Sequence, residues 1–129
     1  MILKTSIIAM FNVFVSVPRE WTDYNRLKEV CDYYLSNKIQ QGENISIIIQ
    51  DKNNLAEQYA IEKGFNVLFV PLDWRYGKKA YLVRDSQLMD MSNACILFYS
   101  SYSNNLAQDS VYNLATNKHI LVRSVHEDD

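Results

Sequence analysis

Two kinds of hydrophobic pattern alternate along the chain. Short apolar runs rich in β-branched and aromatic residues predict buried strands, and longer stretches with apolar residues three or four positions apart predict helices. The predicted strands cover residues 7–15, 45–49, 66–70, 94–99 and 119–125. The predicted helices cover residues 23–41, 55–63, 78–91 and 106–117.

This alternation predicts an α/β fold, a single Rossmann-like three-layer domain with a parallel five-stranded sheet. Right-handed crossovers favour the doubly wound strand order 3-2-1-4-5. In that order the chain reverses direction between strands 1 and 4, and a ligand crevice is expected over their carboxyl ends, where residues 16–21 and 100–105 emerge. We expect all 129 residues to belong to one domain with a core over about residues 7–125.

Local signals predict the helix ends and the core. Gly42 and Gly64 follow the first two helices, where glycine commonly ends a helix. Thr22 is the expected N-cap of the first helix. Capping boxes, an Asn followed three residues later by Glu or Gln, are expected at Asn54 with Glu57 and at Asn105 with Gln108. The residues expected on one face of the first helix are Leu27, Cys31, Tyr34, Leu35 and Lys38 or Ile39. The core residues expected from the third helix are Leu82, Leu88 and Met89.

Charge and cysteine content limit the kinds of partner that we expect for this chain. The net charge is −2 and the chain has no basic tail or stripe, so we expect no binding to duplex nucleic acid. Cys31 and Cys95 lie in apolar surroundings without metal-ligand spacing, which indicates a reduced pair in a cytoplasmic protein and no metal site. Residues 7–17 after Lys4 resemble a signal peptide, but Asn12 interrupts the run and no small-residue cleavage site precedes Pro18. A strand is expected there, and the run is too short to span a membrane.

Glycine is scarce. Only three glycines occur, and two of them are the helix terminators above, which leaves Gly77. Neither a G-x-G-x-x-G fingerprint nor a Walker loop is present. Phosphate-cradling loops need glycine so that the backbone can approach the anion. We therefore expect no tightly held dinucleotide and no resident cofactor.

Residues 71–85, between the third strand and the third helix, hold the densest group of candidate side chains. A strand-to-helix junction favours anions. The candidates for phosphate contacts are Arg19, Arg75, Lys78, Lys79 and Arg84. Trp21 and Trp74 both fall in loops at this edge, where each can either stack on a base or close the rim of the core. The candidate acids are Asp73, Asp85 and Glu20, each of which can also be a solvated or capping carboxylate.

Several motifs carry a family resemblance. They are Arg-Glu-Trp-Thr-Asp-Tyr at 19–24, Leu-Ala with Tyr-Ala within 55–60, Pro71 with Trp-Arg-Tyr-Gly-Lys-Lys-Ala at 74–80, and Arg-Asp with Met within 84–89. In this order, over about residues 12–123, the chain resembles the YspA-like members of the SLOG superfamily. These are Rossmann-like domains related to the DprA/SMF and LOG proteins. The resemblance implies a nucleotide or nucleotide-derived ligand.

The chain also departs from that family. Val17-Pro18-Arg19 keeps only the arginine of the usual Gly-Ser-Arg, and Ala80-Tyr81 replaces an Ala-Gly pair. The resemblance therefore implies ligand-binding roles for a limited set of residues: Arg19, Trp74, Gly77, Arg84 and Asp85. Lys78 joins them as a phosphate candidate. A copy so poor in glycine would suit a phage or a mobile element.

Three functions stay open. The first is a non-catalytic module that binds a nucleotide-derived small molecule at the edge formed by Arg19 and residues 74–85. The second is a degenerate SLOG-like domain that acts through a protein partner or as a homo-oligomer, with loop and helix tyrosines as the contact residues. The third is a phosphoribohydrolase or N-glycosidase type of enzyme with Asp73, Asp85 or Glu20 as acid or base. The loss of glycine argues most strongly against the third.

Overall fold

The computed structural model describes residues 10–52, 54–102 and 104–128 of the chain. It is an α/β fold with a five-stranded, all-parallel sheet in the order β3-β2-β1-β4-β5. The predicted Rossmann-like architecture and strand order are therefore confirmed. The strands are β1 (Met10–Ser16), β2 (Asn44–Ile49), β3 (Asn66–Phe69), β4 (Ala94–Tyr99) and β5 (Leu121–His126). The helices are α1 (Tyr24–Gln40), α2 (Leu55–Lys63), the 3-10 helix η1 (Trp74–Lys79), α3 (Ala80–Asp90) and α4 (Leu106–Asn117).

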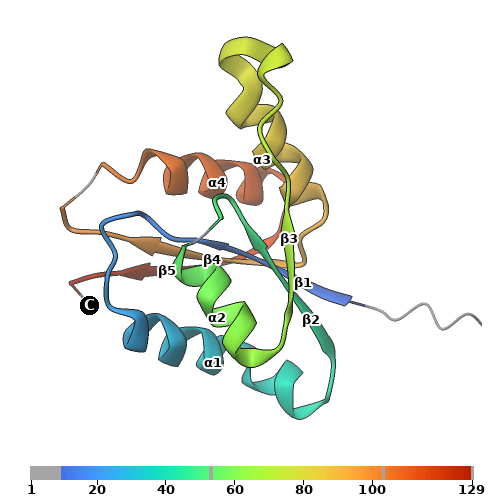
Figure 1. Cartoon of the computed structure of the whole chain (residues 1–129), viewed down its shortest axis with the longest axis vertical. Coiled ribbons are helices and arrows are strands. Elements are labelled where there is room, and N and C mark those ends of the chain that lie inside the picture. The colour runs from blue at the N-terminus through green and yellow to red at the C-terminus, as the bar shows by residue number, and fades with distance from the viewer. Residues whose placement is uncertain (1–9, 53, 103, 129) are drawn as a thin grey trace, which may run out of the picture.

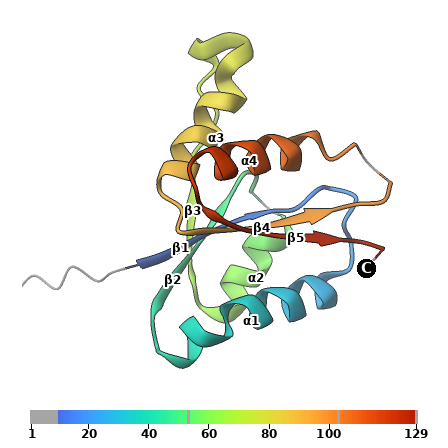
Figure 2. The same cartoon turned by 180° about the vertical axis from the view of Figure 1, so that it is seen from behind.

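Two hydrophobic layers hold the sheet between its helices (Figures 1 and 2). Helices α1 and α2 cover one face, where Leu27, Cys31 and Tyr59 pack on β-branched residues of β1 and β2. Helices α3 and α4 cover the other face, where Leu88 and Val111 pack against strand residues. Strand residues alternate between the two layers because successive side chains of a strand point to opposite faces.

The helix ends follow local chemistry, with two differences from the predictions. Helix α1 is capped by Asp23, whose Oδ1 accepts from the backbone N–H of Arg26 at 3.1 Å, and the prediction of Thr22 was wrong. Asn54 caps α2 as predicted, accepting from the N–H of Glu57. The second predicted capping box was also wrong, because Asn105 has a left-handed backbone and makes no side-chain cap.

The chain between β3 and α3 differs most from its prediction. A continuous helix was expected from residue 78, but η1 extends to Lys79 and α3 begins at Ala80. Gly77 has φ 58° and ψ −130°, which breaks the helical path between the two. Leu82, expected in the core, is 52% exposed because this part of α3 stands clear of the sheet (Figure 1). We call residues 71–83 the arm.

The first and last strands also differ slightly from their predicted bounds. Strand β1 is described from Met10, and the earlier part of the predicted strand, residues 7–9, lies outside the described residues. Strand β5 begins at Leu121 and not at residue 119, because His119 has φ 59° and its N–H donates to the carbonyl of Thr116. His119 therefore belongs to the turn after α4.

Candidate functional site

The candidate site lies where the strand order reverses, over the carboxyl ends of β1 and β4. Ser16, the last residue of β1, pairs with Leu97 of β4. Gln50 follows the last residue of β2 on the adjacent strand. In open parallel sheets this edge is where ligands bind, because the crossing connections leave a crevice there.

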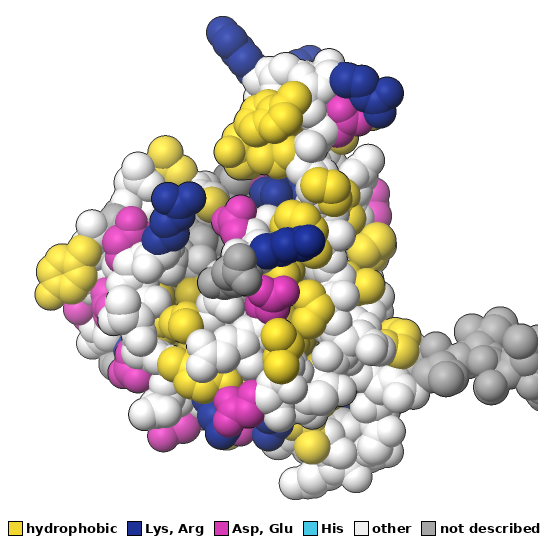
Figure 3. All heavy atoms as spheres, viewed as in Figure 1, with side chains coloured by type: hydrophobic (Ala, Val, Ile, Leu, Met, Phe, Trp, Pro, Cys, Tyr) yellow, Lys and Arg dark blue, Asp and Glu magenta, His cyan; other side chains and the backbone are white. Residues whose placement is uncertain are grey.

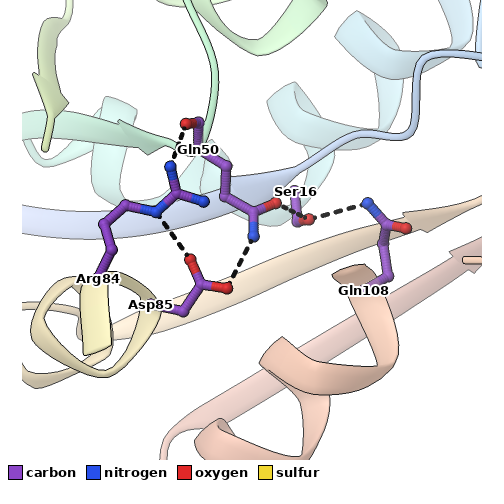
Figure 4. A network of polar contacts seen from close by, with 5 residues as sticks. All are labelled: Ser16, Gln50, Arg84, Asp85 and Gln108. Carbon is purple, nitrogen blue, oxygen red and sulfur yellow. Dashed lines mark hydrogen bonds and ion pairs between the residues drawn. The ribbon is translucent and has the colours of Figure 1, made fainter. Parts of the chain in front are cut away.

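A buried polar network fills the floor of this edge (Figure 4). The Ser16 hydroxyl donates to Gln50 Oε1 at 2.5 Å and accepts from Gln108 Nε2 at 3.1 Å. Gln50 Nε2 donates in turn to Asp85 Oδ2 at 3.3 Å. Arg84 completes the network, donating through Nε to Asp85 Oδ1 at 3.1 Å and through Nη1 to the backbone carbonyl of Gln50 at 2.9 Å. The network joins β1, the end of β2, α3 and α4.

Burial sets the electrostatics of this network. Removal from water raises the pKa of Asp85 above its ordinary 3.8, and the Arg84 guanidinium and the Gln50 amide only partly offset that rise. Two of the three side-chain nitrogens of Arg84, Nε and Nη1, donate hydrogen bonds. Within the described residues its Nη2 makes no hydrogen bond, although the side chain is only 5% exposed. The network therefore leaves one guanidinium nitrogen of Arg84, Nη2, without an acceptor among the described residues.

The arm presents a second group of side chains beside this network. Asp73 caps η1 through the N–H of Arg75 and holds the Arg75 guanidinium at 2.7 Å, which lowers the pKa of Asp73. Trp74 is 65% exposed and meets Tyr81 edge to face at 5.8 Å between ring centroids. The Arg84 guanidinium lies 5.7 Å from the Tyr81 ring, so the aromatic pair and the buried cation adjoin.

Among the described residues, cavities open at three places along this edge. The arm cavity, about 560 Å³, lies between residues 70–76 and one face of α3, and both Trp74 and Arg84 line it. A cavity of about 210 Å³ lies between the loops after β1 and β4 and is lined by Gln50 and Gln108. A third, about 590 Å³, lies between the loop after β1 and the start of α2. Arg19 lines the second and third cavities but not the first.

Side chains of Asn105 and Glu127 accept hydrogen bonds from the loop after β4. Asn105 Oδ1 accepts from the N–H of Ser100 at 3.0 Å, and its Nδ2 donates to the Ser100 carbonyl. Glu127 Oε1 accepts from the N–H of Ser101 at 2.9 Å and from the Ser100 hydroxyl at 3.2 Å. Asn105 therefore shapes this loop, which explains why it does not cap α4.

The sequence candidates fall into separate groups. Trp74, Arg84 and Asp73 line the arm cavity, and Asp85 lies beneath it in the buried network without lining any of the three cavities above. Arg19 and Glu20 are exposed on the loop after β1, at the 210 Å³ cavity. Lys78 and Gly77 lie exposed in η1 and do not line the arm cavity.

The two tryptophans have different environments. Trp21 is 2% exposed, packs edge to face on Phe98 at 5.0 Å, and donates from Nε1 to the Asp23 carbonyl at 3.0 Å. Of the two roles left open for it, closing the core is the one observed. Trp74 is the tryptophan that a ligand can reach.

Sequence reasoning missed three members of the buried network: Ser16, Gln50 and Gln108. A signal for two of them was present, because Ser16 and Gln50 are the first polar residues after the apolar runs of neighbouring strands. Carboxyl ends of parallel strands meet at one edge, so polar residues there are neighbours. Gln108 was assigned to a capping box, which concealed that its side chain is buried against Ser16.

Comparison with known proteins gives no assignment: no family model matches the chain, and no curated protein matches it. Among the described residues, no group of three or more His, Cys, Asp or Glu side chains is arranged to hold a metal ion. No helix within the described ranges is long and apolar enough to cross a membrane.

Proposed function

We propose that the chain is a non-catalytic binding module for a nucleotide or nucleotide-derived ligand at the carboxyl edge of its sheet. The observation that carries the proposal is Arg84, a buried guanidinium that lines a cavity walled by an exposed tryptophan and whose Nη2 makes no hydrogen bond within the described residues. A guanidinium suits a phosphate and an exposed indole suits a base, which are the two halves of a nucleotide. The resemblance to YspA-like SLOG domains supports the same ligand class.

The arrangement of carboxylates supports a binding role over a hydrolytic one. Asp73 is held by Arg75 in the arm, and Asp85 is held by Arg84 and Gln50 in the floor. Glu20 lies at a different cavity from Asp73. General acid and base groups must reach the same scissile bond. Chromatography of nucleotides after prolonged incubation should therefore recover them intact, and turnover lost on Asp85→Asn would establish the enzyme instead.

Thermal unfolding in the presence of nucleotides tests the binding function. A ligand that binds only the folded state at about 100 times its Kd adds about 2.7 kcal/mol of stability, which is a measurable rise in Tm. We expect at least one member of a panel of nucleotides to raise the Tm of the wild type. Trp74→Ala should reduce that rise, whereas Tyr33→Ala, an exposed aromatic on α1, should leave it unchanged. A panel without any effect on Tm contradicts the proposal.

Self-association is the second candidate function, and the exposed apolar side chains of the arm favour it. Trp74, Tyr76, Tyr81 and Leu82 are all exposed there. Aromatic residues concentrated on one projection are typical of protein interfaces. Sedimentation over a range of protein concentrations tests it: a dimer that dissociates on Tyr81→Ala would support this function, and a monomer at every concentration would exclude it.

We further propose that the module works in the cytoplasm. Both cysteines are free and buried, and burial raises the pKa of each thiol above its ordinary 9.0. Unreactive, unpaired thiols are usual in reducing compartments. Localisation of the full chain by fractionation of its native cells tests this assignment.

A further inference from the structure

A cavity of about 360 Å³ lies at the opposite ends of the strands from the candidate site. The first residues of the strands, among them Phe11, Ala94 and Leu121, form one wall, and residues 33–38 of α1 form the other. We call it the α1 cavity. Its volume lies within the range of small-molecule sites. The amino edge of the sheet therefore has room for a ligand of its own.

The α1 cavity exists because α1 does not cover the sheet along its whole length (Figure 2). Helix α2 contacts β2 and β3, so the cover of β4 and β5 on this face falls to α1. Leu35 is buried, but Tyr34 and Ile39, near the end of the helix, are exposed. Leu121, the first residue of β5, is consequently 54% exposed. Apolar side chains of the strands are therefore open to an apolar ligand.

Both charged side chains that line the α1 cavity are cations. They are Lys38 and Arg123, and no Asp or Glu of the described ranges joins them. Lys38 is partly compensated, because its Nζ lies 3.1 Å from Glu43 Oε2. Arg123 makes no hydrogen bond or ion pair with the described residues, and its guanidinium lies 5.7 Å from the centroid of the Tyr34 ring. Arg123 is therefore an uncompensated cation beside an apolar wall.

The cavities of the candidate site have a different charge pattern. Figure 3 shows cationic and hydrophobic side chains together on the arm, but the arm cavity is lined by Asp73 as well as by arginines. The other two cavities at the carboxyl edge are both lined by Asp51. The α1 cavity combines cations and apolar side chains without a carboxylate in its lining. An anion is therefore attracted to the α1 cavity without repulsion from its walls.

Charge also decides between a small anion and a larger occupant. A second copy of the chain, bound about a twofold axis at this cavity, would present the same surface, so that Lys38 and Arg123 would meet cations. The nine residues before β1 contain Lys4 and no carboxylate side chain. Neither of these occupants supplies the negative charge that the lining favours, whereas a small anion does.

The C-terminal end of α1 adjoins the cavity and does not cancel this attraction. Helix C-termini carry partial negative charge on carbonyl groups that lack partners. Here the carbonyls of residues 37–39 accept hydrogen bonds from the N–H groups of residues 41–43, and Lys38 lies in the last turn. The helix end is therefore satisfied within the chain, and its charge is offset by a lysine.

We propose that the α1 cavity binds a small aromatic carboxylate, whose ring lies against the apolar wall and whose carboxylate meets the guanidinium of Arg123. Phe11 and the pair Tyr33–Tyr34, edge to face at 5.4 Å, offer rings to an aromatic body. A guanidinium holds a carboxylate through two parallel N–H donors. The site is separate from the arm cavity and does not depend on the nucleotide-binding function.

Calorimetric titration of the full chain at low salt with three probes that share one aromatic body tests the proposal. The probes are 2-naphthoate, its neutral analogue 2-naphthamide and the cation 2-naphthylmethylammonium. We expect 2-naphthoate to bind about fivefold tighter than 2-naphthamide, as an exposed ion pair allows, and the cation to bind more weakly than both. Arg123→Gln should reduce the affinity for 2-naphthoate to that for 2-naphthamide and should alter the affinity for 2-naphthamide by less than about twofold.

Arg19→Gln is the matched change at the carboxyl edge, and it should alter the affinity for 2-naphthoate by less than about twofold. Because Arg123 is exposed and makes no hydrogen bond with the described residues, Arg123→Gln should fold like the wild type, which circular dichroism checks. Equal affinities for 2-naphthoate and 2-naphthamide would overturn the proposal, as would the absence of binding by all three probes up to about millimolar concentration. A dimer that dissociates on Tyr33→Ala would also overturn it, because a second copy would then cover the cavity.

Discussion

Arg84 donates from Nε to Oδ1 of its sequence neighbour Asp85 at 3.1 Å, and the two side chains are each only 5% exposed. Consecutive residues on a helix do not face each other, so this contact needs an outside anchor. Gln50 supplies it from the end of β2, accepting from Arg84 through its carbonyl and donating to Asp85 through its amide. The pair therefore fixes α3 against the carboxyl edge of the sheet and orients the guanidinium.

The raised pKa of Asp85 predicts a pH dependence of stability. The folded protein binds this proton more tightly than the unfolded chain, so the contribution of Asp85 to the free energy of unfolding is full below the ordinary pKa of 3.8 and is lost as pH rises through the raised value. Asp85→Asn removes this contribution. Urea unfolding at several pH values should show the wild type losing stability relative to Asp85→Asn as pH rises from about 3.8.

The matched control for that series is Glu29→Gln, a change at an exposed carboxyl of α1. Its stability difference from the wild type should stay flat over the same pH range. A difference between wild type and Asp85→Asn that is also flat, or that rises in favour of the wild type with pH, would show that pairing with Arg84 outweighs burial.

Replacing each of the two tryptophans should change the free energy of unfolding by different amounts. Trp21→Ala removes a buried ring from the core and should lower the free energy of unfolding by about 3–5 kcal/mol. Trp74→Ala removes an exposed ring and should change it by less than about 1 kcal/mol. Urea unfolding monitored by circular dichroism measures both. Equal losses for the two variants would contradict the assignment of Trp21 to the core and Trp74 to the surface.

Ser16 should be coupled energetically to Gln108. Ser16→Ala leaves two buried amide groups without their hydroxyl partner and should destabilise the protein by about 1–3 kcal/mol. Gln108→Leu removes one of those amides, so the double variant should lose less stability than the sum of the single variants, by at least about 0.5 kcal/mol. A double-mutant cycle in urea measures the coupling. Strict additivity would contradict the network, and Ser36→Ala, a half-buried hydroxyl of α1, is the matched change outside it.

The backbone conformation of Gly77 should make it intolerant of a side chain. Its φ of 58° with ψ of −130° is a conformation that side chains disfavour more strongly than that of Gly64, at φ 73° and ψ 21°. An added Cβ meets nothing within 4 Å at either glycine, so strain alone separates them. We expect Gly77→Ala to lower the free energy of unfolding by about 1–3 kcal/mol and to distort the arm. Unfolding curves for Gly77→Ala and Gly64→Ala give the comparison, and a smaller loss at Gly77 would contradict it.

Elements with strong periodicity were predictable from the sequence. Helix α2 and strand β4 match their predicted bounds, because an apolar run of fixed period bounded by a cap or a glycine determines them locally. The strand order followed from the alternation of strands and helices together with the handedness of crossovers. Periodicity, helix caps and crossover handedness can all be applied to a single sequence without an alignment.

The interior of the candidate site was not predictable in the same way. The contact between Gln108 and Ser16 joins residues 92 positions apart, which no local pattern encodes. Asn105 has the residue type of a cap, yet its contacts with Ser100 hold it in another conformation. Local propensity is weak enough for such tertiary contacts to override it. The course of the arm was not predicted because it depends on the backbone angles of Gly77 and not on a hydrophobic period.

Observation of the indole N–H signals by NMR during titration with nucleoside 5′-monophosphates tests the central claim most directly. The chain has two tryptophans, so Trp74 reports on the arm cavity while the buried Trp21 is a control within the same spectrum. A saturable shift of the Trp74 signal, with the Trp21 signal unchanged and the response lost in the Arg84→Gln/Asp85→Asn variant, is the predicted result. A Trp74 signal that stays constant with every nucleotide up to about millimolar concentration, where binding is worth only about 4 kcal/mol, would contradict the account.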